Sequence, residues 1–220
     1  FAGLSVRQLG EAPYVPAVRE ALRFPSREIG LEGAPGAQVY LPPNIAGYVG
    51  ADHTAMLLAA GVNESNSVSL ALDIGTNTEI SLAKGGKLVC CSCASGPAFE
   101  GAHIHAGMRA VSGAVERAEF YKDEWLVSTI DNAPAVGICG SGILDVVAGL
   151  LDSGQIDFTG RFTELAHRMV DYKQGGAIVL VPRSESGTGK DILVTRSDIR
   201  EIQLAKAAIR AGVEALLRAT

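Results

Sequence analysis

Hydrophobic residues recur at different spacings along this 220-residue chain. Residues 1–37 are rich in Pro and Gly and hold little periodicity, which indicates an irregular, partly extended connection. A short strand is expected at residues 38–41. Small and apolar residues then recur at helical spacing over residues 46–60, and Gly61 is the expected stop. The face predicted to be buried carries Tyr48, Ala51, Ala55 and Leu58.

A different pattern begins after a polar break at residues 63–66, which is the expected boundary between two lobes. Residues 68–73 form a mostly apolar run of the length typical of a buried strand. Residues 79–84 and 88–94 alternate like strands. They are joined by Gly85-Gly86, a dipeptide typical of tight hairpins.

The remaining chain mixes further strands with helices, which is typical of an α/β fold. The elements predicted there are a hairpin of residues 114–121 and 125–130, a strand at 136–139, a helix from there to about 153, and strands at 177–181 and 192–195. Thr195 and Asp198 have the spacing of a capping box, with Asp in the reciprocal position. The long helix that follows places its expected core residues at a helical period: Ile199, Ile202, Ile209, Val213 and Leu216.

The composition and charge of the chain narrow its function. The formal net charge is −5 and no cluster of Lys or Arg stands out, which argues against a nucleic-acid partner. No apolar run approaches the roughly 18 residues of a membrane span. No leader is visible and three of the four cysteines are crowded together, so a cytoplasmic location is expected. The chain opens on Phe1, and its last helix reaches Thr220 without a capping residue, so a fragment truncated at both ends is expected.

One loop carries the strongest chemical signal: Asp73-Ile74-Gly75-Thr76-Asn77-Thr78, between two predicted strands. Gly75 allows a tight turn and lets a phosphate approach the main chain without a Cβ in the way. Backbone N–H groups, the Thr76 and Thr78 hydroxyls and the Asn77 amide can surround anionic oxygens. Asp73 at the strand end can hold Mg²⁺ directly or through water, and is the predicted catalytic residue. The alternative is a tight polar β-turn without function.

Two more glycine loops are candidates to close around the same ligand. Residues 95–101 follow the strand paired with the phosphate hairpin, which places them at the same sheet edge; Glu100 would bind ribose or order a water, or simply open a helix. Residues 137–142 lead from a strand into a helix, whose N–H groups attract anions; their glycines can equally serve close helix–strand packing. The nucleotide-binding residues predicted in these loops are Gly96, Glu100, Gly140, Ser141 and Gly142.

Clustered cysteines and histidines are candidate metal ligands. Cys90, Cys91 and Cys93 lie on one predicted strand, where Cys91 and Cys93 share a face and Cys90 points away. That spacing fits neither a zinc knuckle nor a ferredoxin cluster, so small buried strand residues are expected. His103 and His105 have no acidic or Cys partner at a usual spacing, so local packing or hydrogen bonding is the preferred interpretation.

The sequence also resembles a known family. Asp73-Ile74-Gly75-Thr76-Asn77 is similar to the second phosphate motif of the actin, sugar kinase and heat-shock ATPase superfamily, which has a ribonuclease H-like α/β fold with a mixed sheet flanked by helices. Within it, the chain resembles the reductive activators of corrinoid proteins. The stretches that carry this resemblance are residues 41–52, 72–80, 94–109, 137–145 and 199–209. The resemblance makes residues 1–66 the end of the first lobe with its lobe-connecting helix, and residues 67–220 most of the second lobe.

The resemblance implies an ATP- and Mg²⁺-binding domain of a protein that couples ATP hydrolysis to the reduction of inactive Co(II) corrinoid to Co(I) in methyl transfer. It implies a corrinoid protein and a low-potential electron donor as partners, and a homodimer. A [2Fe–2S] module is expected only upstream of Phe1, because ferredoxin-spaced cysteines are missing here. The first phosphate motif and the adenosine motif are also expected outside this chain, so the chain alone is expected to be inactive.

Two other functions remain open from the sequence. A small-molecule kinase of the same fold would need a catalytic Asp facing a substrate pocket, and none stands out beyond the phosphate loop. A non-enzymatic, nucleotide-regulated binding module is the other alternative.

Overall fold

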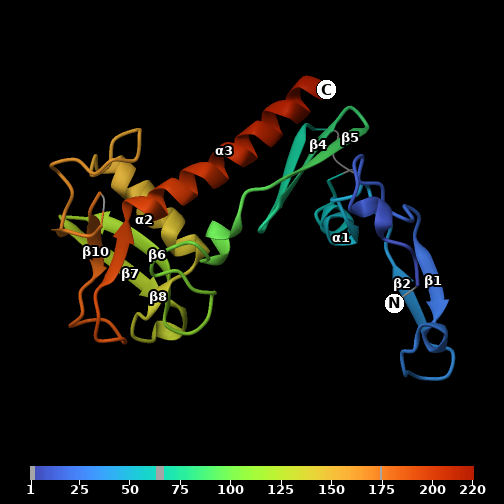
Figure 1. The fold of residues 1–220 in the computed structure, drawn as a ribbon, viewed down its shortest axis with the longest axis horizontal. Helices are drawn as coiled ribbons and strands as arrows, with labels where there is room; N and C mark the ends of the chain where they lie inside the picture. The colour runs from blue at the N-terminus through green and yellow to red at the C-terminus, as the bar shows by residue number, and fades with distance from the viewer. Residues whose placement is uncertain (1–2, 63–66, 174) are drawn as a thin grey trace. The chain divides into compact units, whose positions relative to one another are not determined.

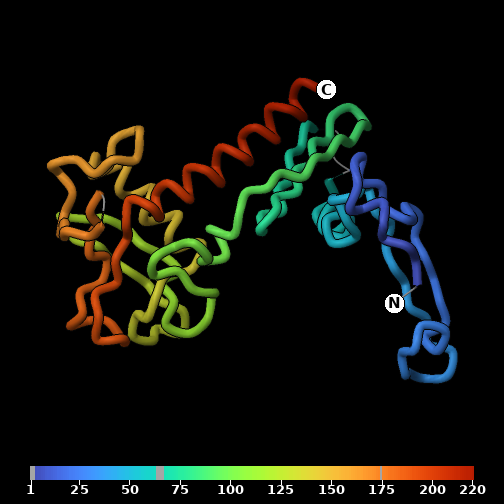
Figure 2. Tube along the Cα trace, in the orientation of Figure 1, coloured from blue at the N-terminus to red at the C-terminus, as the bar shows by residue number. Residues whose placement is uncertain are grey.

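The computed structural model describes residues 3–62, 67–173 and 175–220. They form two compact units (Figures 1 and 2). The first comprises the described residues up to Asp73, with Thr78–Cys93 and Ala211–Thr220; the second comprises Ile74–Asn77 and Ala94–Arg210. The predicted boundary at residues 63–66 lies outside the described residues.

The first unit opens with a strand pair that the sequence only half predicted. Strand β2 (Gln38–Leu41) is where it was expected, and it pairs antiparallel with β1 (Leu22–Pro25), so Leu22 lies opposite Leu41. The short 3-10 helices are η1 (Arg7–Leu9) and η2 (Ser26–Ile29). Describing residues 1–37 as irregular was therefore wrong for β1. Its four residues are too few to show a period, and its pairing partner defines it.

Helix α1 (Ala51–Ala59) is shorter than predicted, and it buries a different face. Its buried residues are His53 and Leu57, whereas Leu58 is 80% exposed and Tyr48 is 52% exposed. Residues 46–49 form a tight turn instead of helix, in which the Val49 N–H donates to the Ala46 carbonyl. The hydrophobic period missed this face because its central residue is a polar histidine.

A three-stranded sheet follows, with the order β3 (Ser69–Ile74), β4 (Thr78–Lys84) and β5 (Lys87–Cys93). The predicted Gly85-Gly86 hairpin is confirmed, and both glycines have positive φ. Strand β3 is half-buried and not buried as expected: Leu70 and Leu72 are 46% and 41% exposed. Successive side chains of a strand point to opposite faces of the sheet, and Leu70 and Leu72 lie on the exposed face of β3.

The second unit is built around a hairpin and one helix. Strands β6 (Ala114–Tyr121) and β7 (Glu124–Thr129) pair antiparallel as predicted, and β8 (Gly137–Ile138) joins β6 in parallel. The predicted helix α2 (Gly140–Asp152) packs on β6. Its fully buried residues are Ile143, Val146 and Leu150. The short 3-10 helices η3 (Pro97–Glu100) and η4 (Ile130–Asn132) lie in the connections.

A second small sheet leads into the last helix. Its strand order is β11 (Ile192–Thr195), β10 (Ala177–Val181) and β9 (Met169–Val170), with β10 and β11 at their predicted positions. Helix α3 (Arg196–Ala219) starts with the predicted capping box. The Asp198 N–H donates to the Thr195 hydroxyl at 3.2 Å, and the Thr195 N–H donates to the Asp198 carboxylate at 2.8 Å. Across the described residues, no helix is long and apolar enough to cross a membrane.

Candidate functional site

The predicted phosphate loop is a tight turn that directly follows Asp73. The carboxylate-bearing side chain of Asp73 is 42% exposed near the end of β3. In the loop, the Gly75 N–H donates to the Asn77 carbonyl at 3.0 Å. Gly75 does not have a positive φ, and a Cβ there would lie 3.3 Å from the Asn77 carbonyl oxygen. Gly75 therefore leaves the main chain uncovered, although its own conformation does not demand glycine.

The loop of residues 95–101 lies against this turn, as its expected place at the same sheet edge requires. The Gly96 N–H donates to the Thr76 carbonyl at 2.9 Å, and the Ser95 hydroxyl donates to the Gly75 carbonyl at 3.1 Å. The Thr76 hydroxyl donates to the Glu100 carboxylate. Two side chains predicted to bind nucleotide therefore meet, and both are exposed.

The third glycine loop joins the same group through η3. A Cβ at Gly140 would collide with the Phe99 carbonyl, and one at Gly142 would collide with the Val115 carbonyl. The Ser141 hydroxyl donates to the Glu116 carbonyl at 2.8 Å. Each residue of this loop thus has a packing or hydrogen-bonding role of its own. Its predicted contact with nucleotide stays a prediction.

Burial separates the predicted residues further. Thr76 and Asn77 are exposed, whereas Thr78 is fully buried and Gly142 is buried. The Thr78 hydroxyl is therefore turned away from solvent, although the sequence placed it among the ligand-binding groups. The oxygen-bearing side chains accessible around the turn are those of Asp73, Thr76, Asn77 and Glu100.

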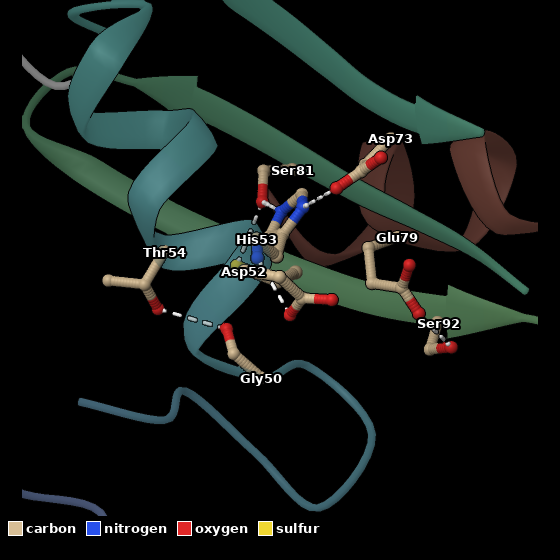
Figure 3. A network of polar contacts seen from close by, with 9 residues as sticks. Gly50, Asp52, His53, Thr54, Asp73, Glu79, Ser81 and Ser92 are labelled. Atoms are coloured by element: carbon tan, nitrogen blue, oxygen red, sulfur yellow. Dashed lines mark hydrogen bonds and ion pairs between the residues drawn. The ribbon is translucent and has the colours of Figure 1, made fainter. Parts of the chain in front are cut away.

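The structure also reveals a residue that sequence reasoning missed. His53 of α1 is completely buried, and its Nε2 lies 2.6 Å from the Ser81 hydroxyl of β4. Its Nδ1 lies 4.0 Å from a carboxylate oxygen of Asp73 (Figure 3). The Ser81 Oγ also lies 3.1 Å from the Cys90 Sγ. One sequence signal could have found this cluster: Ser81 is a polar residue in the otherwise apolar run 80–83.

Comparison with known proteins identifies the family. Residues 67–220 match the family model of the C-terminal domain of RACo, the ASKHA domain, and residues 1–65 match that of the RACo middle region. The chain belongs to the RACo family. The actin-like ATPase fold expected from the sequence is thereby confirmed.

Members of the RACo family and related proteins match nearly the whole chain. A corrinoid activation enzyme, RamQ, of Eubacterium limosum is 36% identical and matches 96% of this chain. A [Co(II) methylated amine-specific corrinoid protein] reductase of Methanosarcina barkeri is 30% identical and matches 88%. A solved reductive activator for corrinoid, iron-sulfur protein is 40% identical, covers 96% of the chain and superposes with a TM-score of 0.86. The chain spans 37% of the length of each curated relative and 34% of the solved chain.

The residues around the turn after Asp73 suit Mg²⁺ and a phosphate ester. Mg²⁺ prefers hard oxygen ligands, and the Asp73 carboxylate is a partly exposed ligand of that kind. The Thr76 hydroxyl and the Asn77 amide supply hydrogen-bond groups beside a glycine backbone. The donor set therefore fits the cofactors expected from the sequence.

The cysteines and histidines that are candidate metal ligands have local partners. Cys91 and Cys93 lie on the face of β5 that meets Gly212 of α3, while Cys90 contacts Ser81 on the other face, as strand alternation predicted. Burial raises the pKa of the Cys91 and Cys93 thiols, which keeps them neutral at physiological pH.

The two histidines each have a polar neighbour. The His105 Nδ1 lies 3.1 Å from the Tyr172 hydroxyl, within hydrogen-bond distance, and the two rings are tilted by 58° with centroids 4.8 Å apart. The His103 Nδ1 lies 3.8 Å from a Glu201 carboxylate oxygen, at the exposed surface. Both side chains therefore take part in local contacts.

Proposed function

We propose that this chain is the ATP-binding part of an ATPase that reductively reactivates a corrinoid protein, converting Co(II) to Co(I) so that methyl transfer resumes. The observation that carries the proposal is the contact between the phosphate turn and the loop of residues 95–101, within a domain of the RACo family. The names of the relatives, a corrinoid activation enzyme and a corrinoid protein reductase, support the choice of partner.

The residues of the turn take distinct roles in this proposal. When nucleotide binds, the Thr76 hydroxyl exchanges Glu100 for a phosphate oxygen, together with the Asn77 amide and the backbone N–H groups that follow Gly75. Asp73 would hold Mg²⁺ directly or through water, and the bound ion would supply positive charge for the transferred phosphoryl group. The Glu100 carboxylate suits a ribose hydroxyl or a water better than a phosphate. Without nucleotide, its contact with the Thr76 hydroxyl keeps both side chains at the same edge of the turn.

Coupling to reduction requires that nucleotide be bound differently in two states of the complex. A nucleotide shifts the equilibrium between these states only by the difference of its affinities for them. The proposal includes a corrinoid protein that docks on the activator, a low-potential electron donor and a [2Fe–2S] module in the intact protein. A homodimeric assembly and a cytoplasmic location are also part of the proposal.

Asp73→Asn in the full-length protein tests the proposal. The protein is mixed with a Co(II) corrinoid protein, a low-potential reductant and Mg-ATP, and Co(I) is followed by visible absorbance. Loss of a metal-holding carboxylate should cost about 3 kcal/mol of transition-state stabilisation, hence about 100-fold in ATP hydrolysis. ATP-dependent Co(I) formation should fall with it.

Asp123→Asn is the matched control, because Asp123 occupies a positive-φ turn position that Asn also tolerates. Wild-type hydrolysis by the Asp73→Asn protein would remove Asp73 from the site. Hydrolysis without any Co(I) in the wild-type protein would redirect the function to a kinase or to a nucleotide-regulated binding role.

A further inference from the structure

The imidazole of His53 is held on one side and unsatisfied on the other. Its Nε2 lies 2.6 Å from the Ser81 hydroxyl, and its ring is fully buried. Its Nδ1 is also buried and has no hydrogen-bond partner among the described residues. The carboxylate group facing Nδ1 is that of Asp73, 4.0 Å away (Figure 3). A buried polar nitrogen without a partner is unfavourable, so this arrangement favours an approach of the carboxylate.

The backbone that carries the ring is anchored. The backbone N–H of His53 donates to the Asp52 carboxylate at 2.9 Å, within the first turn of α1. The next residue, Thr54, donates its hydroxyl to the Pro43 carbonyl at 2.9 Å. Asp73 is the less enclosed member of the pair, because its side chain is 42% exposed and that of His53 is fully buried. The carboxylate is therefore the group with room to move toward Nδ1.

Other partners and roles for this ring are weaker. The nearby Glu79 carboxylate already accepts a hydrogen bond from the Ser92 hydroxyl at 2.9 Å (Figure 3). Ser81, His53 and Asp73 have the residue types of a nucleophilic triad, but Ser81 is fully buried. A substrate carbonyl cannot reach its oxygen, so nucleophilic catalysis does not follow from this cluster.

We propose that His53 is a positioning residue for Asp73: the Ser81 hydroxyl donates to Nε2, and the protonated Nδ1 donates to one carboxylate oxygen of Asp73, so that the other is aimed for Mg²⁺ or a water bound to it. This inference rests on the proposed function, in which Asp73 serves a magnesium nucleotide. Partners that orient a ligating carboxylate tune metal affinity although they do not touch the metal. His53 thus acts only through Asp73.

A pair of substitutions separates the two sides of the ring. In His53→Asn the side-chain amide replaces Nδ1, which faces Asp73, whereas in His53→Gln it replaces Nε2, which faces Ser81. Binding of Mn²⁺ with a non-hydrolysable ATP analogue to the full-length protein is measured by electron paramagnetic resonance. His53→Gln should weaken Mn²⁺ binding about 10-fold, as loss of an orienting partner does. His53→Asn should stay within about threefold of wild type.

Controls distinguish positioning from packing. Leu57→Ala removes a buried side chain one turn further along the same helix, and should lower stability without changing Mn²⁺ affinity. Ser81→Ala removes the clamp on the far side of the ring, and should weaken Mn²⁺ binding about threefold because the ring loosens. It also serves if a His53 variant does not fold.

The outcomes discriminate among the hypotheses. Equal Mn²⁺ affinities in His53→Asn and His53→Gln, or unchanged affinity in Ser81→Ala, would overturn the positioning role and leave His53 as a packing residue. Asp73→Asn is measured in the same assay. If that variant binds Mn²⁺ as wild type does, the proposed function of the site fails, independently of His53.

Discussion

The turn of residues 74–77 and the loop of residues 137–142, both in the second unit, differ in what they require of glycine. At Gly140 and Gly142 a Cβ would collide with the carbonyl oxygens of Phe99 and Val115, which are backbone atoms that cannot move aside. At Gly75 the nearest atom to a Cβ is the Asn77 carbonyl oxygen at 3.3 Å, and φ is not positive. Packing therefore accounts for the first two glycines and does not account for Gly75.

The difference indicates where ligand binding is the better explanation of a glycine. A glycine that packing does not demand, beside exposed Thr76 and Asn77, leaves its backbone uncovered for a phosphate. Where a neighbouring carbonyl occupies the space that a Cβ would take, close packing already explains the glycine. On this basis the turn after Asp73 is the stronger candidate for a ligand site, and the loop before α2 packs against η3.

The largest expected effect is from Gly142→Ala. Its Cβ meets the Val115 carbonyl at the start of α2, so α2 must move from β6, at a cost of about 3 kcal/mol. Thermal unfolding of the purified protein, followed by circular dichroism, should show this loss. Gly10→Ala is the control, since its Cβ would have only an ordinary contact at 3.6 Å. Equal stability of the two variants would contradict the packing role.

Gly75→Ala should show the opposite behaviour. A contact of 3.3 Å to one carbonyl oxygen is tight and needs a shift of that atom, at a cost of about 1 kcal/mol, the low end of the range for overpacking, so the variant should still fold. Its affinity for Mg-ATP should fall about 10-fold, because a Cβ would stand between the backbone and a phosphate at a cost of about 1.4 kcal/mol. Isothermal titration of the full-length protein measures this affinity. A folded variant with unchanged affinity would place the phosphate elsewhere.

Elements defined by local chemistry were predictable from the sequence. The Gly85-Gly86 hairpin, the capping box of Thr195 and Asp198, and the apolar stripe of α2 each depend on residues close in the chain. Strand β1 and the exposure of β3 depend on distant pairing, and no local pattern reports them. The three-dimensional partners of a strand, more than its own residues, decide these features.

The candidate site shows the same division. The turn after Asp73 and its proximity to residues 95–101 follow from strand connectivity, so the sequence could predict them. His53 could not be found in that way, because a hydrophobic period gives no weight to a buried polar residue. Its partner Ser81 is 28 residues away in the chain. The buried face of α1 was therefore predicted to be the one that carries Leu58, which is 80% exposed.

The smallest expected effects compare one hydroxyl from each loop. Thr76→Val removes the hydroxyl that donates to Glu100, and should weaken Mg-ATP binding about fivefold, equivalent to about 1 kcal/mol for one hydrogen bond. Thr76→Ser should restore the affinity. Ser141→Ala removes the hydroxyl that donates to the Glu116 carbonyl, and should lower stability by about 0.5 kcal/mol.

The comparison is decided by titrating Mg-ATP into both variants under identical conditions. If the Ser141 hydroxyl serves Glu116 alone, Ser141→Ala binds nucleotide as wild type does and only its unfolding temperature falls. If Ser141→Ala loses as much affinity as Thr76→Val, the loop before α2 contacts the nucleotide as well. The original prediction for Gly140 and Ser141 would then hold, and close packing would be only one of the reasons for glycine in that loop.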